Sequence, residues 1–201
     1  QASGSVDLYG EDGSFIRGGP LPVDGACTIT SVESVPMAVQ TVAAAGEVCH
    51  EDNSPTQYLD AERYCASSVL SPMAGNSYGP ENLFWGPEGA AWCEGVAGNG
   101  EGETIRIETD PAVTIHALVI RNGYQKSAST FSDNGRARKI EIVAAGQRMT
   151  YTLHDTTGPQ RLAFRRPIVA DTVTLRILSV YPGARYADTC ISSFTLDLEG
   201  F

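Results

Sequence analysis

The sequence predicts an all-β protein, built as a sandwich or barrel of short strands. Of its 201 residues 19% are charged, 21 are glycine and 11 are proline. The charged share lies below the roughly 25% of average proteins, which disfavours long solvated helices and favours strands joined by turns. Short segments of the second half also alternate apolar and polar residues, the pattern of half-buried strands.

Strands are expected at regular intervals from residue 103 onward. Glu103–Thr109 alternates isoleucines with charged residues, and Asp110-Pro111 ends it. The nearly continuous apolar run Val113–Arg121 predicts a strand buried on both faces. Turn residues such as Asn134-Gly135 separate the later segments, as in sandwiches and barrels. These later strands are Arg138–Val143, Arg148–Leu153, Arg161–Phe164, Val173–Leu178 and Ile191–Leu198.

The first third of the chain differs in charge from the rest. Residues 1–65 hold 10 acidic and 2 basic side chains, so −8 of the chain's net charge of −10 lies there. We therefore expect an acidic N-terminal extension or small lobe at 1–65 and a second domain at 66–201. The extension is expected to be β-rich, either as strands added to the same sandwich or as a small lobe tethered by disulfides. Its expected elements are a Ser5–Tyr9 and Ser14–Arg17 hairpin, a strand at Ala26–Val32, and a strand or short helix at Met37–Ala45.

Charge and hydropathy narrow the classes of partner. A net charge of −10 repels polyanions, so nucleic-acid binding is not expected. No stretch approaches ~18 consecutive apolar residues, so no membrane-spanning helix is expected. The five cysteines are widely spaced without a C-x-x-C pair, which favours disulfides and a secreted or extracytoplasmic location. A start at Gln1-Ala2-Ser3 fits a chain whose signal peptide has been removed, and it also fits a trimmed chain.

One enzyme-like pattern occurs. Gly75-Asn76-Ser77-Tyr78-Gly79 matches G-x-S-x-G, the nucleophile elbow of α/β-hydrolases, which works at a strand-to-helix turn. Pro80 follows at once and no such frame surrounds Ser77, so a glycine-rich loop is the preferred interpretation. The available bases would be His50, His116 and His154.

Two further patterns are interpreted as loops. Gly95–Gly102 is rich in glycine but matches neither the P-loop nor G-x-G-x-x-G. Asp7, Glu11 and Asp12 could hold calcium, but they miss the EF-hand spacing, and a solvated turn is preferred.

Aromatic and polar residues gather in the segments expected to connect strands. Sugar sites need a flat aromatic face for the apolar side of a pyranose, together with acids, amides or basic groups for its hydroxyls. A structural interpretation is equally open, with Trp92 filling the sandwich and Asn122 and Asp188 capping turns. The stacking candidates are Trp92, Tyr124, Tyr181 and Tyr186, and the hydrogen-bonding candidates are Glu94, Asn122, Lys126, Asn134, Arg136 and Asp188.

The order of these motifs resembles a known family. The motifs are Ser67–Leu70, Asn76–Leu83, Ala91–Gly95, Gly100–Ile105, Asn122–Lys126, Asn134–Arg136 and Tyr181–Ser192. Together they resemble the NADase-type glycan-binding domains, which are discoidin-like modules of the galactose-binding fold and include the translocation region of streptococcal NAD glycohydrolase. The resemblance covers about 66–201. It implies an eight-stranded jelly-roll sandwich that binds glycans at loops on one end, without catalysis.

The resemblance also bears on calcium and on the cysteines. Related modules place an Asp and a Thr near a structural calcium, where this chain has Trp85 and Ala90 or Ala91. The loss of two oxygen donors puts calcium in doubt, although backbone carbonyls could still hold an ion, and no cofactor is expected. The motifs place Cys93 and Cys190 at strand ends on one side of the sandwich, and we expect a disulfide between them. Cys27 is then expected to pair with Cys49 or Cys65.

The leading hypothesis is an extracytoplasmic, non-catalytic, lectin-like module that binds cell-surface carbohydrate. The alternative is a structural or adhesive subunit of a larger assembly, docked to other proteins through residues 1–65. A serine hydrolase acting through Ser77 is the third hypothesis.

Overall fold

The computed structural model describes residues 46–73, 75–84 and 89–200 in full, and before them the backbone of strands 5–9, 15–20 and 29–34. The elements of these residues are, in chain order, β1 (Ser5–Tyr9), β2 (Phe15–Pro20), β3 (Ile29–Ser34), β4 (Val48–Asp52), β5 (Ala61–Ala66), α1 (Glu81–Phe84), β6 (Trp92–Cys93), β7 (Thr104–Asn122), α2 (Ala128–Asp133), β8 (Gly135–Ala144), β9 (Gln147–Thr152), β10 (Gln160–Tyr181) and β11 (Thr189–Asp197).

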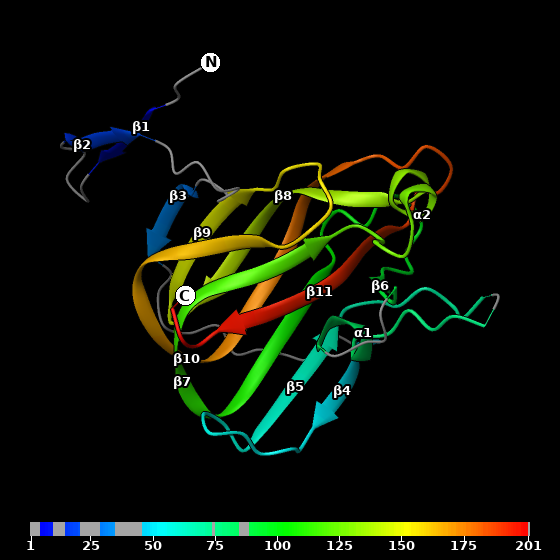
Figure 1. Ribbon diagram of the computed structural model, residues 1–201, viewed down its shortest axis with the longest axis horizontal. Coiled ribbons are helices and arrows are strands. Elements are labelled where there is room, and N and C mark those ends of the chain that lie inside the picture. Colours follow the sequence, from blue (N-terminus) through cyan, green and yellow to red (C-terminus); the bar gives the residue numbers. More distant parts are fainter. Residues whose placement is uncertain are drawn as a thin grey trace.

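Two long antiparallel strands, β7 and β10, organise the main sheet (Figure 1). Each one bends, so its two halves belong to different layers. The first half of β7 pairs with β5 and its second half pairs with β11. The second half of β10 pairs with β8, which continues through β9 to β3. The result is a β-sandwich, as the sequence predicted.

The core lies between these layers. In β7, Ile105 and Ile107 are at most 1% exposed, as the predicted alternation requires, and Leu118 and Ile120 in its second half are fully buried. Facing strands contribute the rest of one continuous apolar cluster, including Ile140, Ile142, Leu175, Ile177 and Phe194. The burial of these side chains is the main stabilising contribution, at about 25 cal/mol per Å² of apolar surface.

The expectation of separate short strands was wrong in two places. Glu103–Thr109 and Val113–Arg121 are parts of the single strand β7, and Arg161–Phe164 and Val173–Leu178 are parts of β10. The register between β7 and β10 is interrupted where Asp110-Pro111 lies, because proline cannot donate to the ladder. The chain therefore bends there and carries on as a strand.

Strands from the first third of the chain also enter the main sheet. β3 pairs with β9, and β5 pairs with both β4 and β7. The β1–β2 pair forms a two-stranded sheet of its own and confirms the predicted hairpin. The division at residues 65 and 66 stays a prediction. Met37–Ala45 lies outside the described residues. None of the described helices is both long enough and apolar enough to cross a membrane.

Two disulfides are present. Cys93 and Cys190 are bonded, with their Cα atoms 4.1 Å apart, as expected. The expected pairing of Cys27 with Cys49 or Cys65 was wrong, because those two cysteines lie opposite each other on β4 and β5 and bond to one another. Cys27 itself lies outside the described residues.

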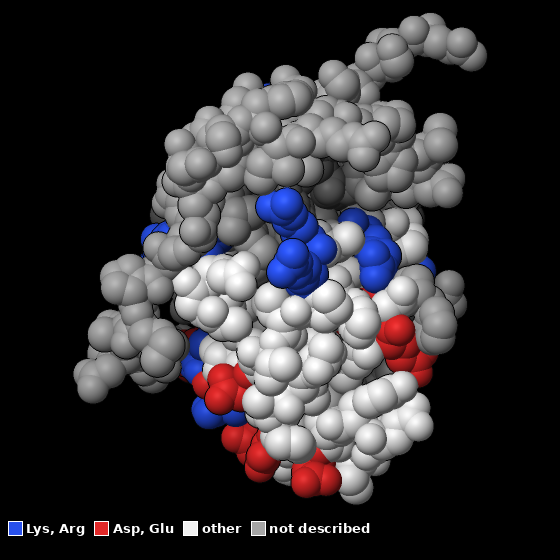
Figure 2. All heavy atoms as spheres, turned by 90° about the vertical axis from the view of Figure 1, so that its left-hand side faces the viewer, with Lys and Arg blue, Asp and Glu red and all other residues white. Residues whose placement is uncertain are grey.

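The end of the molecule opposite α2 carries charges of both signs. Figure 2 shows a few basic side chains beside a broad uncharged area that acidic side chains border. The described part of this face therefore offers no continuous basic surface of the kind that phosphate binding uses.

Candidate functional site

Five of the predicted binding residues line a single cavity of about 420 Å³, which we call the rim pocket. They come from two distant segments of the chain, the one that follows β7 and the one that follows β10. They are Tyr124, Lys126, Asn134, Tyr186 and Asp188. The pocket is completed by Leu70, Met73, Asn76, Tyr78, Ser127 and Thr130. Its volume lies in the range of about 300–1,000 Å³ typical of small-molecule sites.

A tight turn after β7 starts one wall of the rim pocket. Gly123 has a φ of +80°, and a Cβ there would lie 2.6 Å from Arg136 Cγ and 2.8 Å from Phe131 Cε2. Only glycine adopts this positive φ without strain and also leaves room for the Arg136 and Phe131 side chains. The turn brings Tyr124 beneath α2, where the Tyr124 carbonyl accepts a hydrogen bond from Thr130 Oγ1 at 3.1 Å.

The short helix α2 is held by caps at both ends. Ser127 Oγ accepts from the Thr130 backbone N–H at 3.1 Å, and Thr130 Oγ1 accepts from the Ser127 backbone N–H at 2.9 Å. This is a capping box, which satisfies two otherwise unpaired donors. At the other end, Asn134 Nδ2 donates to the Thr130 carbonyl at 2.8 Å. These bonds fix the positions of Ser127, Thr130 and Asn134 in the pocket wall.

The loop after β10 forms the opposite wall and is bonded to α2. The Asp133 carbonyl accepts hydrogen bonds from the backbone N–H groups of Arg185 at 3.1 Å and Tyr186 at 2.8 Å. Gly183 passes so close that a Cβ there would lie 2.4 Å from the carbonyl oxygens of both Asp133 and Tyr186. Two residues beyond Asp188, Cys190 is bonded to Cys93. The loop is therefore anchored on both sides of its pocket residues.

The rim pocket combines aromatic rings with charges that have no ionic partner. Lys126 Nζ donates to Asn76 Oδ1 at 2.9 Å, and neither Lys126 nor Asp188 makes an ion pair with a described residue. Tyr186 is 38% exposed, whereas Tyr124 is buried and packs edge-on against Tyr78. An exposed ring, a donor-only ammonium and an acceptor-only carboxylate suit a ligand with an apolar face and several hydroxyls.

The other five predicted residues are engaged inside the fold, and three of them, Trp92, Glu94 and Asn122, are fully buried. Trp92 is fully buried and donates from Nε1 to the Ser68 carbonyl at 3.0 Å. Glu94 is also fully buried, and its carboxylate accepts from the backbone N–H groups of Thr189 at 3.1 Å and Val96 at 2.8 Å. Burial raises the pKa of Glu94, which these hydrogen bonds partly offset. Both residues therefore hold separate segments of the chain together, through bonds to Ser68, Val96 and Thr189.

Asn122, Arg136 and Tyr181 are likewise occupied by internal contacts. The Asn122 side-chain amide donates to the Ala137 carbonyl at 2.7 Å and accepts from the Ala137 backbone N–H at 3.0 Å. Arg136 forms a two-pronged ion pair with Asp155, with Nε to Oδ1 at 2.6 Å and Nη2 to Oδ2 at 3.0 Å. The Tyr181 hydroxyl donates to a backbone carbonyl at 3.0 Å. We therefore do not assign these residues to the ligand site.

The geometry around Ser77 lacks the partners of a catalytic serine. None of the three histidines hydrogen-bonds to Ser77, and the Ser77 carbonyl accepts from Asn82 Nδ2 at 2.9 Å. The segment before it forms an isolated bridge between Met73 and Asn76, and α1 after it is a single turn. The described residues around this motif therefore do not form a strand-to-helix elbow.

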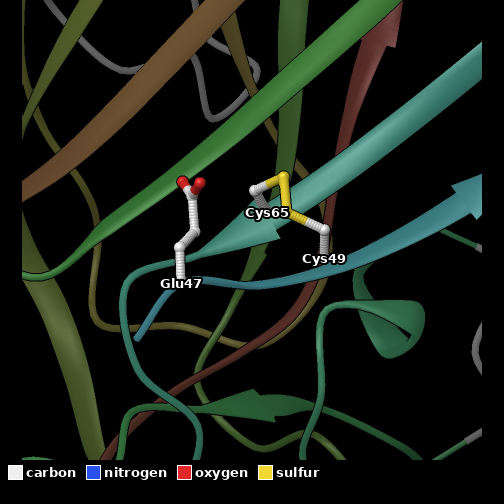
Figure 3. Close-up of side chains that lie close together, drawn as sticks. All are labelled: Glu47, Cys49 and Cys65. Carbon is white, nitrogen blue, oxygen red and sulfur yellow. A yellow bond between two sulfur atoms is a disulfide. The ribbon is translucent and has the colours of Figure 1, made fainter. Parts of the chain in front are cut away.

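The described residues contain one group of side chains with metal-ligand character, namely Glu47, Cys49 and Cys65. Figure 3 shows that the two sulfurs are bonded to each other and that the Glu47 side chain stands beside them. The Glu47 carboxylate pairs with Arg106 at 2.7 Å. Disulfide sulfurs are not thiolates, so this group is not a metal site.

The described residues at the expected calcium position do not fit that ion. Ala90 and Ala91 supply no side-chain oxygen, and the Ala91 carbonyl already accepts from Asn82 Nδ2 at 3.0 Å. Calcium needs about six or more oxygen ligands. Trp85, Glu11 and Asp12 lie outside the described residues, and only the backbone of Asp7 is described.

Sequence reasoning missed three polar contributors to the rim pocket, Asn76, Ser127 and Thr130. Asn76 lies in the motif that was interpreted as a glycine-rich loop, and its place beside Lys126 depends on a contact 50 residues apart in sequence. Thr130 was detectable in principle, because Ser127 and Thr130 have the spacing of a helix cap.

Comparison with known proteins identifies the domain type. The family model described as NAD glycohydrolase translocation F5/8 type C domain matches residues 57–197. This confirms the resemblance seen in the sequence, with a start a few residues earlier than expected. A search of curated proteins gave no match.

Several solved structures share the fold at low sequence identity. The family 32 carbohydrate-binding module of C. perfringens NanJ, solved with galactose, has a TM-score of 0.51 at 15% identity and aligns over 67% of this chain and 92% of its own. CpGH89CBM32-5 from Clostridium perfringens, solved with GalNAc-β-1,3-galactose, has a TM-score of 0.52 at 16% identity over 67% and 94%. These similarities place the sandwich in the discoidin-like fold.

A larger protein contains a similar region. The arabinofuranosyltransferase AftD from Mycobacteria has a TM-score of 0.54 at 17% identity over 77% of this chain. This chain spans 11% of the length of that transferase.

Proposed function

Because this chain belongs to the NAD glycohydrolase translocation F5/8 type C domain family, we propose that it is a non-catalytic carbohydrate-binding module that holds a glycan in the rim pocket. The observation that carries the proposal is the convergence of Tyr124, Lys126, Asn134, Tyr186 and Asp188 on one cavity. These residues come from separate loops, and each is of a type that sugar recognition uses.

In this proposal, different side chains of the pocket contact the apolar side and the hydroxyl groups of a pyranose ring. The exposed face of Tyr186 stacks on the apolar side of the sugar. Asp188 accepts hydrogen bonds from sugar hydroxyls, and Lys126 donates to a ring or hydroxyl oxygen. Because Lys126 and Asp188 contribute opposite formal charges, the pocket favours a neutral glycan over a highly charged one. Galactosides are the first to test, since the two carbohydrate-binding modules above were solved with ligands that contain galactose.

The two disulfides support an extracytoplasmic location, because cytosolic proteins of most organisms keep their thiols reduced. The lack of a hydrogen bond between Ser77 and any of the three histidines, His50, His116 and His154, supports a role in binding without hydrolysis. A fluorophosphonate probe that labels Ser77 would contradict the non-catalytic role.

A glycan array followed by calorimetry with the best-binding sugar tests the function. Lys126→Ala is expected to lower the affinity about tenfold, the value of one hydrogen bond to a charged group. The chain offers a matched control, since its other lysine, Lys139, is exposed on β8 outside the rim pocket. Lys139→Ala should leave the affinity unchanged. Equal effects of the two substitutions, or no bound glycan, would contradict the proposal.

A further inference from the structure

A second and larger cavity, of about 790 Å³, runs along β11 beside the rim pocket. We call it the β11 groove. Its walls come from the segment between β4 and β5, from α1, and from the β7–β11 pair. It is lined by Thr56, Gln57, Tyr58, Leu59, Glu62, Asn82, Phe84, Gly89, Ala90, Val119, Arg121, Gln125, Pro159, Ser192, Ser193, Thr195, Leu196 and Leu198. Beyond residue 191, β11 pairs with β7 on one side and with no described strand on the other.

One wall of the β11 groove is a row of outward-facing side chains. Arg121 lies directly across from Ser193, and Val119 lies across from Thr195. Arg121 is exposed and forms no ion pair with a described residue. This wall therefore offers two hydroxyls and a guanidinium that has no ionic partner among the described residues, which are groups that bind the hydroxyls and ring oxygens of sugars.

The opposite wall has aromatic rings above buried polar groups. Tyr58 is 42% exposed and Phe84 is half-buried, so each ring leaves surface for an apolar sugar face. Glu62 and Asn82 also line this wall, although they are only 6% and 4% exposed. The Glu62 carboxylate has one hydrogen bond from a described residue, donated by the Tyr64 hydroxyl at 3.1 Å. It keeps capacity to accept another.

A single stretch of chain separates the two cavities. Tyr124 and Lys126 line the rim pocket, whereas Gln125 between them lines the β11 groove. Across this stretch, a Cβ on Gly89 of the groove would lie 3.1 Å from Lys126 Cγ. The β11 groove therefore begins where the rim pocket ends.

We propose that the β11 groove is a second sugar subsite, so that the ligand of this domain is an oligosaccharide that lies across both cavities rather than a terminal monosaccharide in the rim pocket alone. The inference rests on the proposed function, since the rim pocket must bind sugar first. Both cavities lie within the size range of ligand sites, and each combines aromatic and hydrogen-bonding side chains.

Calorimetry with galactose, GalNAc-β-1,3-galactose and a tetrasaccharide ending in that disaccharide tests the inference. The tetrasaccharide is expected to bind about tenfold more tightly than the disaccharide, because it reaches Arg121. Arg121→Ala should remove that gain and leave the disaccharide affinity unchanged. Arg176→Ala is the matched control, since Arg176 is exposed on β10 and lines neither cavity.

The outcomes separate the two proposals. If all three sugars bind with equal affinity and Lys126→Ala weakens each of them, the rim pocket is retained and the β11 groove is rejected. The same holds if Arg121→Ala leaves the tetrasaccharide affinity unchanged. If none of the three sugars binds, or if Lys126→Ala has no effect on them, both proposals are rejected.

Discussion

The backbone N–H of Tyr186 donates a hydrogen bond to the Asp133 carbonyl at 2.8 Å, which fixes the loop after β10 to the last residue of α2. These residues are more than 50 positions apart in the chain. The contact joins the two segments of chain that line the rim pocket, the one that contains α2 and the one that contains Tyr186. The position of the loop after β10 therefore depends on contacts made outside the pocket. A substitution that loosens the loop can be compared with one that removes a pocket side chain.

Loss of the Cys93–Cys190 disulfide should weaken both the fold and glycan binding. This bond closes 97 residues, and the chain-entropy model puts its contribution at about 4 kcal/mol. The double substitution of both cysteines by alanine should lower the free energy of unfolding in urea by that order and reduce glycan affinity, since Asp188 lies two residues away. Alanine at both Cys49 and Cys65 is the control.

The control disulfide links the outer strand β4 to β5, with a sequence separation of 16 residues. Neither of its cysteines lines the rim pocket. Its loss should cost about 3 kcal/mol in stability and leave the affinity for galactose, which is proposed to occupy the rim pocket alone, unchanged for the folded protein. An unchanged affinity in the Cys93 and Cys190 variant would show that this bond does not position the pocket.

Substitution of Tyr186 should separate stacking from hydrogen bonding. Tyr186→Phe keeps the ring and should retain affinity, whereas Tyr186→Ala removes it and should lower affinity about tenfold, as aromatic contacts of about 0.5–1.5 kcal/mol plus buried area predict. Because Tyr186 is 38% exposed, the urea stability of both variants should stay within ~0.5 kcal/mol of the parent. Equal glycan affinities of the phenylalanine and alanine variants would argue against stacking.

Stability should depend on pH through Glu62. Burial raises its pKa to about 7 from an ordinary value of 4.5, and the nearby Asp52 carboxylate adds to that rise. The folded protein therefore holds this proton where the unfolded chain has lost it. Stability should fall as pH rises from about 4.5 to about 7, by at most about 3 kcal/mol from this group.

Glu62→Gln removes that dependence. In urea unfolding at several pH values, the stability of the variant relative to the parent should improve steadily between about pH 4.5 and 7. Parallel curves for the two proteins would mean that Glu62 is not a buried acid with a raised pKa.

Arg136 should prove to be a residue of the fold. Its side chain is 10% exposed, pairs with Asp155 and donates to the Asn134 carbonyl at 2.7 Å. Arg136→Ala should therefore cost about 3 kcal/mol in the free energy of unfolding. Arg138→Ala, at an exposed position that contacts the Tyr181 ring, should cost under ~1 kcal/mol. Similar costs for the two substitutions would contradict the structural role of Arg136.

The sequence predicted the sandwich because alternation in segments such as Glu103–Thr109 reports directly on burial. It did not predict that this segment and Val113–Arg121 are one strand, since a proline usually ends pairing and here only bends it. The pairing of Cys49 with Cys65 follows from the register of β4 on β5. Cysteine spacing carries no information about register, so the alternatives could not be separated beforehand.

The sequence predicted which types of residue and which loops form the candidate site. It did not predict which of these side chains point into the pocket and which point into the core. Trp92 and Tyr186 are both aromatic residues in motif segments, yet Trp92 points into the core and Tyr186 into the rim pocket. Asn122 and Asn134 show the same contrast. Asn122, the last residue of β7, hydrogen-bonds to Ala137 of the neighbouring strand β8, whereas Asn134 lines the rim pocket. Which side of a loop faces inward depends on pairing between distant strands, and local sequence does not encode it.

Titration of ¹⁵N-labelled protein with GalNAc-β-1,3-galactose, followed by NMR, tests the central claim most directly. The account predicts that the largest shifts occur at Tyr124, Lys126, Asn134, Tyr186 and Asp188, the five residues that converge on the rim pocket. Saturable shifts confined to the opposite end of the sandwich, or no shifts at all, would contradict it.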